Sequence, residues 1–280
     1  MEGTDMDTHW TDLPKLTVSS IADTSCALKF QRLRIDKTGW GLKREGPPVT
    51  VPRGKAVHDA LLFLHQNRWE DQVPMHKVNT LAQQAVQAAR YERGVDKDGE
   101  VKRVVEAVRL FCDNQDAEDV LSIQALETQI EFDYKYKGRK LVRMSATIDR
   151  VLVRPTMPRR LVVQDYKTTR QKIDLRECFL LLYCASQKWT EYDEYVLEMI
   201  WIDVEEHQVL MDVIEARHVS GQLGLITAAL LRILDNEPIP EPGPQCTFCP
   251  MREGCQGLDA VDLDDDEVDN PFGLAGASDA

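Results

Sequence analysis

Apolar residues recur every three or four positions through most of the first 111 residues, a spacing that places them on one face of a helix. Val57, Leu61 and Leu64, for example, form one such stripe. The pattern predicts helices at 18–34, 56–69, 76–92 and about 101–111.

The period then shortens to two. Apolar Ile130, Phe132, Tyr134 and Tyr136 alternate with charged residues, which is typical of a half-buried strand. Strands are expected at 130–136, 141–153, 161–167, 195–202 and 207–213.

Two helices complete the expected pattern. One begins after Asp174, a candidate N-cap with Glu177 in the capping-box position, and ends near Lys188. The other is amphipathic and covers 219–233. Helices around a central group of strands predict an α/β fold with a mixed sheet flanked by helices.

Composition limits the class of protein. The chain has 280 residues, 43% of them apolar and 29% charged, which suits one large domain with or without an appendage. It has no membrane-spanning apolar run and no signal-peptide pattern, so a soluble cytoplasmic protein is expected.

The net charge of −13 is uneven, because residues 259–280 hold eight acids and no Lys or Arg. The rest of the chain carries 39 acids against 34 bases, a net of −5. The tail is expected to be a disordered, solvating segment, although it could instead compete with DNA for a basic groove.

One stretch reverses this acidic character. Residues 135–172 contain twelve Lys or Arg but only two carboxylates, Asp149 and Asp165, each at the end of an expected strand. Residues two apart in a strand face the same way, so Asp165 and Lys167 should project together. Such a group can hold a divalent metal and cleave a phosphodiester. The alternative is that both Asp residues form ordinary salt bridges with nearby arginines.

The seven cysteines suggest a second metal site. Cys246, Cys249 and Cys255 form a C-x₂-C-x₅-C run, which by spacing alone is a metal site of undetermined type, with zinc the common occupant. Three ligands need a fourth. Cys112, Cys178 and Cys184 lie among apolar neighbours in helical patterns and are expected to be buried and inert.

Several of these residues together resemble a known family. The order of Glu127, Ile148-Asp149-Arg150 and Gln164-Asp165-Tyr166-Lys167-Thr168 is similar to the core of the PD-(D/E)xK nucleases, in particular the RecB-like branch. Upstream, Gly54 to His58 resembles the G-x-x-x-H helix of that branch, and Tyr183 matches the Tyr of its Q-x-x-x-Y helix. Two positions depart from the pattern: Phe179 replaces the Gln, and Ala146 stands where Gly is frequent.

The resemblance implies roles for these residues. Mg²⁺ or Mn²⁺ would be bound by His58, Asp149, Asp165 and the backbone carbonyl of Tyr166. Lys167 would orient or deprotonate water or neutralise developing charge. Glu127 would complete the site or merely cap a strand, and Tyr183 would lie on a polar face along the DNA. Without the resemblance, His58 and His65 both have a structural interpretation, and His65 has no counterpart in the family.

The resemblance extends to the cysteines. AddB and the CRISPR-associated RecB-type nucleases use a similar C-terminal run with one distant N-terminal Cys, and Cys26 stands at the corresponding place. This implies a [4Fe–4S] cluster held by Cys26, Cys246, Cys249 and Cys255, in preference to zinc.

The expected organisation follows from these assignments. The chain divides into a flexible leader (1–14), a nuclease domain (15–240), an iron–sulfur segment (241–258) and the acidic tail (259–280). The nuclease domain would contain a helical insertion at about 70–122 and a catalytic core at about 123–213.

The implied function is that of a free-standing, phage-like DNA exonuclease acting on ends or single strands in recombination or repair. The sequence has no Walker A motif, so any helicase partner would be a separate protein. The alternative is a non-catalytic DNA-end-binding or zinc-stapled regulatory module on the same fold.

Overall fold

The computed structural model describes residues 14–35, 50–67, 74–88, 95–115, 122–154, 158–169 and 172–235, together with Cys249 and Cys255. The tail, the leader up to residue 13, and Cys246 lie outside the described residues. The helices are α1 (Val18–Ile21), η1 (Ala22–Ser25), α2 (Ala27–Phe30), η2 (Gln31–Ile35), α3 (Thr50–Gln66), α4 (Met75–Ala88), α5 (Lys97–Asp113), α7 (Leu175–Lys188), α8 (Ala216–Val219) and α9 (Gln222–Leu234). The strands are β1 (Lys15–Thr17), β2 (Ile123–Tyr136), β3 (Arg139–Arg154), β4 (Arg160–Lys167), β5 (Glu194–Asp203) and β6 (Gln208–Glu215).

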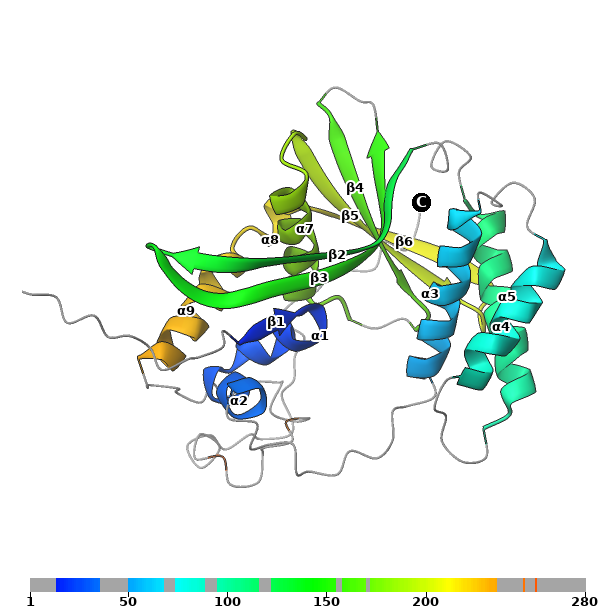
Figure 1. Ribbon diagram of the computed structural model, residues 1–280, viewed down its shortest axis with the longest axis horizontal. Coiled ribbons are helices and arrows are strands. Elements are labelled where there is room, and N and C mark those ends of the chain that lie inside the picture. Colours follow the sequence, from blue (N-terminus) through cyan, green and yellow to red (C-terminus); the bar gives the residue numbers. More distant parts are fainter. Residues whose placement is uncertain are drawn as a thin grey trace, which may run out of the picture.

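The six strands form one mixed sheet in the order β1-β3-β4-β5-β6, with β2 paired to β3. β2 and β3 make a long antiparallel hairpin, whereas β4 and β5 run parallel and are connected through α7. Figure 1 shows the hairpin extending to one side of the molecule and α3, α4 and α5 standing on the other. The predicted α/β fold with a mixed sheet and flanking helices is confirmed.

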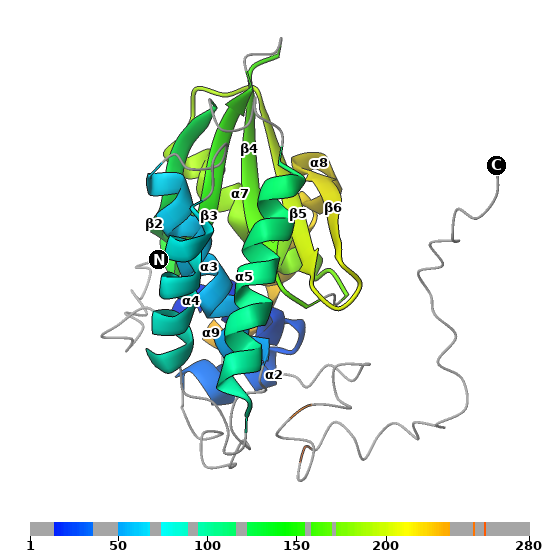
Figure 2. The same cartoon turned by 90° about the vertical axis from the view of Figure 1, so that its right-hand side faces the viewer.

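Helices cover both faces of the sheet, giving three layers. Viewed from the side in Figure 2, α3 and α5 lie in front of the strands and α7 behind them. The apolar residues accordingly form two cores. One joins α7, α9 and the N-terminal helices to β3, β4 and β5; the other joins α3, α4 and α5 to Tyr166, Ile200 and Ile202.

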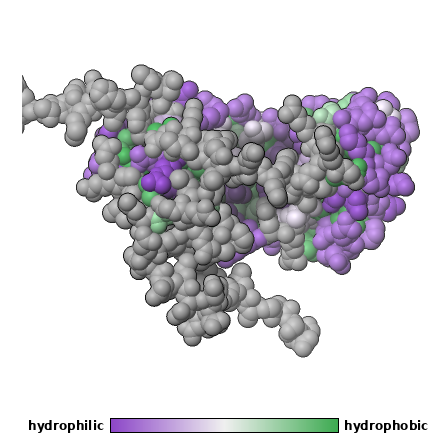
Figure 3. Space-filling view, turned by 90° about the horizontal axis from the view of Figure 1, so that it is seen from below, coloured by the Kyte–Doolittle hydropathy of each residue, from purple (hydrophilic) through white to green (hydrophobic). Residues whose placement is uncertain are grey.

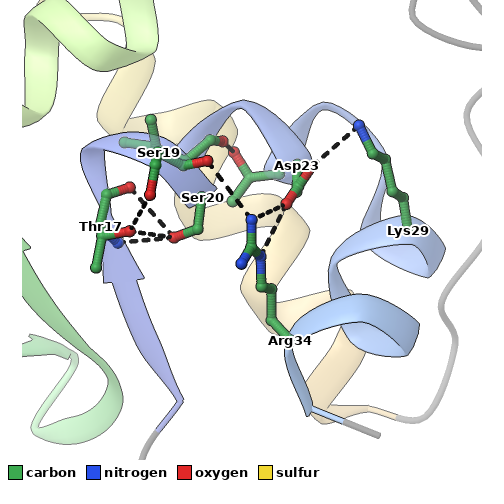
Figure 4. A network of polar contacts seen from close by, with 8 residues as sticks. Thr17, Ser19, Ser20, Asp23, Lys29 and Arg34 are labelled. Atoms are coloured by element: carbon green, nitrogen blue, oxygen red, sulfur yellow. Dashed lines mark hydrogen bonds and ion pairs between the residues drawn. The ribbon is translucent and has the colours of Figure 1, made fainter. Parts of the chain in front are cut away.

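The helix predicted at 18–34 is broken into four short turns, and the preceding strand β1 was not predicted. A buried carboxylate holds these turns together (Figure 4): Asp23 lies 2.9 Å from Lys29 Nζ and 2.7 Å from Arg34 Nη2. Cys26 lies inside this arrangement, and its N–H donates to the Asp23 carbonyl at 3.2 Å. The break follows from the extended backbone of Cys26, whose ψ is 115°.

The remaining predicted elements are present, but β2 begins at Ile123 and α3 at Thr50, well before the predicted starts, and the helix predicted at 219–233 is divided into α8 and α9. Asp174 caps α7 by accepting a hydrogen bond from the Arg176 N–H at 2.8 Å, although no capping-box contact from Glu177 is seen among the described residues.

The end of the molecule that carries α3 to α5 presents mainly hydrophilic side chains when seen from below (Figure 3). Within the described ranges, no helix has both the length and the apolar character that crossing a membrane requires.

Candidate active site

The candidate site lies where β3 separates from β4. One edge of β3 pairs with β2 along most of its length, with irregularities between Ile123 and Ala125 and between Tyr134 and Lys135. The other edge pairs with β1 at Arg143–Ser145 and with β4 at Arg150–Arg154, which leaves residues 146–149 without a strand partner on that edge. The sheet therefore forks immediately before Arg150, and Asp149 lies inside the fork.

The carboxylate of Asp149 bridges the two sides of this fork. Its Oδ2 accepts a hydrogen bond from the Tyr166 N–H at 2.8 Å, which replaces the next rung of the β3–β4 ladder. Its Oδ1 lies 3.2 Å from His58 Nδ1. Asp149 is buried, so both contacts form away from bulk solvent.

His58 reaches the fork from α3. Its Nε2 lies 2.8 Å from the Tyr166 carbonyl oxygen, so the imidazole spans that carbonyl and Asp149. Burial opposes the charged form, but the hydrogen bond and charge of Asp149, with the charge of Asp165, raise the pKa of His58 to about 9.

Gly54 explains how α3 comes so close to the end of β4. A Cβ at this position would lie 3.3 Å from Thr168 Oγ1, closer than an ordinary van der Waals contact. Since Gly54 is one turn before His58, the small residue lets that turn of the helix approach the strand. The G-x-x-x-H spacing thus has a steric reason in this chain.

Glu127 supplies another carboxylate from β2. Leu126 pairs with Arg150 and Thr128 with Ile148, so Glu127 stands opposite Asp149 across the hairpin. Its φ of 39° is in the left-handed region, which is unusual for a residue other than glycine. Burial, followed by the charge of Asp149, raises the pKa of Glu127 to about 7.

These residues form a donor set for a cation. One ligand atom each from His58, Glu127 and Asp149 lie within 4.8 Å of one another. Like charges directly opposite each other in a sheet are destabilising, and a bound divalent cation would remove that penalty. Carboxylate oxygens with one imidazole suit Mn²⁺ and are compatible with Mg²⁺. The residues present therefore fit a divalent metal.

Asp165 and Lys167 lie beside this set at the end of β4. Lys167 Nζ is 2.8 Å from Asp165 Oδ2, as the two-residue spacing predicted. Burial raises the pKa of Asp165, an effect that the charge of Lys167 opposes and the charge of Asp149 reinforces. Burial works against the charge on Lys167, but Asp165 outweighs it and raises the Lys167 pKa. The assignment of Asp165 as a metal ligand stays a prediction, since its carboxylate is paired with Lys167.

Tyr166 is fixed by more contacts than the sequence indicated. Its hydroxyl lies 3.1 Å from Nε2 of the buried His65, and its ring packs edge-on against Phe111 at 5.2 Å. His65 is seven residues after His58 on α3, so two turns of one helix contact the carbonyl and the hydroxyl of the same tyrosine. Residues seven apart in a helix lie on the same face, so the spacing of His58 and His65 was the sequence signal for this contact.

Tyr183 is not brought to the fork. Its ring stacks on Phe179 at 5.2 Å and meets Phe132 and Tyr134 edge-on, on the α7 side of the hairpin. Phe179, which occupies the Gln position of the motif, thus takes part in an aromatic cluster. The catalytic assignment of Tyr183 remains a prediction that these contacts do not support.

Comparison with known families gives a match over almost the whole described chain. The model of the PD-(D/E)XK nuclease superfamily matches residues 15–256. This chain belongs to the PD-(D/E)XK nuclease superfamily. Nucleases of this superfamily use a divalent metal, which agrees with the donor set in the fork.

Solved structures similar to this nuclease-family chain share little sequence with it. A candidate exonuclease from Eubacterium rectale is 10% identical, with a TM-score of 0.48 over 91% of this chain and 93% of that one. The protein SSO0001 is also 10% identical, with a TM-score of 0.32 over 79% of this chain and 92% of that one. No curated protein matches the chain.

Several arginines of the basic stretch that surrounds the site residues are paired with acids from elsewhere in the fold. Carboxylates from β5 and the loop before it pair with three of its arginines, at 3.1 Å for Arg154–Glu198 and 2.8 Å for Arg160–Glu194, with Arg159–Asp193 at 3.9 Å. Arg150 is fully buried. These three arginines therefore face acids of β5 and the loop before it, and not Asp149 or Asp165.

The burial of the cysteines agrees in part with what the sequence predicted. Cys178 and Cys184 are fully buried in α7, and Cys112 is partly buried. Burial raises the pKa of both α7 thiols to about 12. Cys26 is buried as well, while Cys249 and Cys255 are partly exposed. The four-cysteine cluster set includes Cys246, which lies outside the described residues.

Proposed function

We propose that this chain is a metal-dependent deoxyribonuclease of the RecB-like type, acting as an exonuclease on DNA ends or single strands. Membership of the nuclease superfamily supports the reaction class. The observation that carries the proposal is the meeting of His58, Glu127 and Asp149 within 4.8 Å, beside the Asp165–Lys167 pair.

The roles follow from the contacts. His58, Glu127, Asp149 and the Tyr166 carbonyl would hold the cation, with Asp165 as a further candidate ligand. A divalent ion there supplies Lewis-acid polarisation of a phosphoryl oxygen. Lys167, kept cationic by Asp165, is positioned to neutralise charge that develops on the phosphate.

Digestion of end-labelled linear DNA and covalently closed circular DNA tests the proposal. Each substrate is incubated with Mg²⁺, Mn²⁺ or a chelator, as single and as double strands. Metal-dependent release of short products from linear DNA, with circles left intact, is expected. Nicking of circles would overturn the exonuclease assignment. Binding of DNA ends without hydrolysis under every metal condition would identify a non-catalytic module instead.

We also propose that Cys26, Cys246, Cys249 and Cys255 hold a [4Fe–4S] cluster. Support comes from the position of Cys26: α2 and η1 pack against α9, and α9 ends twelve residues before Cys246. The last described helix of the nuclease domain thus packs against the two elements on either side of Cys26. Protein purified without oxygen should be brown and contain about four irons per chain. Stoichiometric zinc without iron would refute the cluster.

A further inference from the structure

A group of exposed cations in the basic stretch lies outside the ion pairs of its neighbours at the tip of the β2–β3 hairpin. At the tip of the β2–β3 hairpin, Lys140 pairs with Asp133 at 2.6 Å, and Arg143 shares the same carboxylate at 3.1 Å. The exposed neighbours Lys135, Lys137 and Arg139 have no carboxylate partner in the described part of the chain. We refer to these three residues as the basic tip.

The basic tip is held in an unfavourable local arrangement. Lys135 stands opposite Lys140 across the hairpin, and the carboxylate beside this pair, Asp133, is bound to Lys140 at 2.6 Å and shared with Arg143. Lys137 has a φ of 48° and Gly138 a φ of 82°, as in a two-residue turn whose first position normally carries Asn, Asp or Gly. The left-handed region is sterically unfavourable for a lysine. Positive charge thus stands at a strained position of the backbone, which points to a ligand that uses it.

The hairpin is held to the rest of the fold on both sides of the basic tip. Just before it, the buried hydroxyl of Tyr134 lies 2.8 Å from Thr227 Oγ1 of α9. Just after it, Leu141 and Val142 are fully buried. The backbone that carries the cations is therefore anchored to the core, at the far end of the hairpin in Figure 1.

The basic tip also lies on the same strand as the site. Asp149 and Arg139 are ten residues apart on β3, which corresponds to at most about 33 Å along the strand. Phosphates in one DNA strand follow one another at about 3.4 Å of helix rise, so about ten nucleotides of duplex reach from the fork to the tip.

We propose that the basic tip binds the phosphate backbone of DNA about ten nucleotides away from the scissile bond, and so anchors long substrates. The proposal rests on the proposed nuclease function and adds a second contact point to it. Because the contact is to phosphates, it is independent of base sequence.

The test compares two triple variants of the full chain with wild type. One is Lys135→Gln, Lys137→Gln, Arg139→Gln. The matched control is Lys77→Gln, Lys97→Gln, Lys102→Gln, which removes the same charge from exposed positions on α4 and α5. Affinity for a 30-nucleotide single strand is measured in chelator by fluorescence anisotropy at several salt concentrations.

The proposal expects the slope of log K against log salt to become shallower by about 2 in the tip variant, from three lost phosphate contacts at about 0.7 each. The control should keep the wild-type slope. Equal slopes in all three proteins would overturn the proposal and leave the cations as charges that protect a strand edge from aggregation.

Cleavage separates this proposal from the nuclease function. With Mn²⁺, the tip variant should cleave a tetranucleotide at the wild-type rate, since so short a strand cannot span from fork to tip, but cleave the 30-nucleotide strand with a higher KM. Equal loss on both lengths would overturn the anchor. Wild-type protein that cleaves neither substrate would refute the nuclease function itself.

Discussion

Replacing Tyr166 with Phe tests whether the residues that position the candidate ligands control metal binding. The change removes only the hydroxyl, which lies 3.1 Å from His65 Nε2 in a fully buried setting, and keeps the ring that packs on Phe111. His65 then loses a buried hydrogen-bond partner, which costs about 1–3 kcal/mol of unfolding free energy.

The effect on the metal follows from the same residue. The Tyr166 carbonyl faces His58, and its N–H binds Asp149, so a shift of the tyrosine moves two candidate ligands together. Loss of a contact that orients a ligand typically lowers metal affinity about 10–100-fold. We expect a loss near the lower end of that range for Mn²⁺, because the ring that remains in the variant still packs on Phe111 and limits the shift. Isothermal titration with Mn²⁺ and urea unfolding in chelator measure the two quantities.

Tyr134→Phe is the matched control. Its hydroxyl is also buried and bonded, to Thr227 at 2.8 Å, but lies along the hairpin away from the fork. This variant should lose similar stability and keep the Mn²⁺ affinity of wild type. If Tyr166→Phe loses stability to the same extent with unchanged Mn²⁺ affinity, the His65–Tyr166 contact is a packing feature and the reasoning is refuted.

Further outcomes are expected for the site residues and for the buried cysteines. Lys167→Ala should abolish cleavage while Mn²⁺ still binds, and cleavage at the wild-type rate would remove Lys167 from the mechanism. Asp165→Ala should lower both the cleavage rate and the affinity for Mn²⁺. His58→Ala should weaken Mn²⁺ more than Mg²⁺, because an imidazole ligand favours Mn²⁺; unchanged titrations with both ions would return His58 to a structural role. Cys178 and Cys184 should resist alkylation in folded protein at pH 8, since burial raises their pKa from the ordinary 9 to about 12. Their folded-state protons are retained to higher pH, so the associated stability is present below about pH 9 and lost towards pH 12; modification of either residue at the rate of denatured protein would contradict this.

The sequence predicted the elements that carry strong periodicity and missed those that depend on tertiary contacts. The alternation from Ile130 to Tyr136 and the apolar run before Asp165 identified β2 and β4 because burial of one or both faces leaves a clear pattern. β1 has only three residues and forms because β3 offers it an edge, so no local signal marks it.

The candidate site could be predicted from the sequence only in part, for the same reason. Asp165 and Lys167 share a strand, so their pairing followed from a two-residue spacing. The meeting of Glu127 with Asp149 depends on the hairpin register and on a left-handed residue, which periodicity does not report. The pairing of Arg154 and Arg160 depends on which strand lies next to them in the sheet, which charge counts along the chain do not report.

The fork in the sheet makes the affinity for cations a part of folding. The candidate ligands His58, Glu127 and Asp149 come from α3, β2 and β3, elements brought together only when the hairpin is packed against the helices. An unfolded chain has no comparable set, so an ion bound there would bind the native state alone and add RT ln(1 + [M]/Kd) to its stability. At a thousandfold excess over Kd this amounts to about 4 kcal/mol, a large share of the total for a domain. Depletion of free divalent ions would then act as a destabilising condition for this protein, raising the population open to proteolysis as well as halting any chemistry.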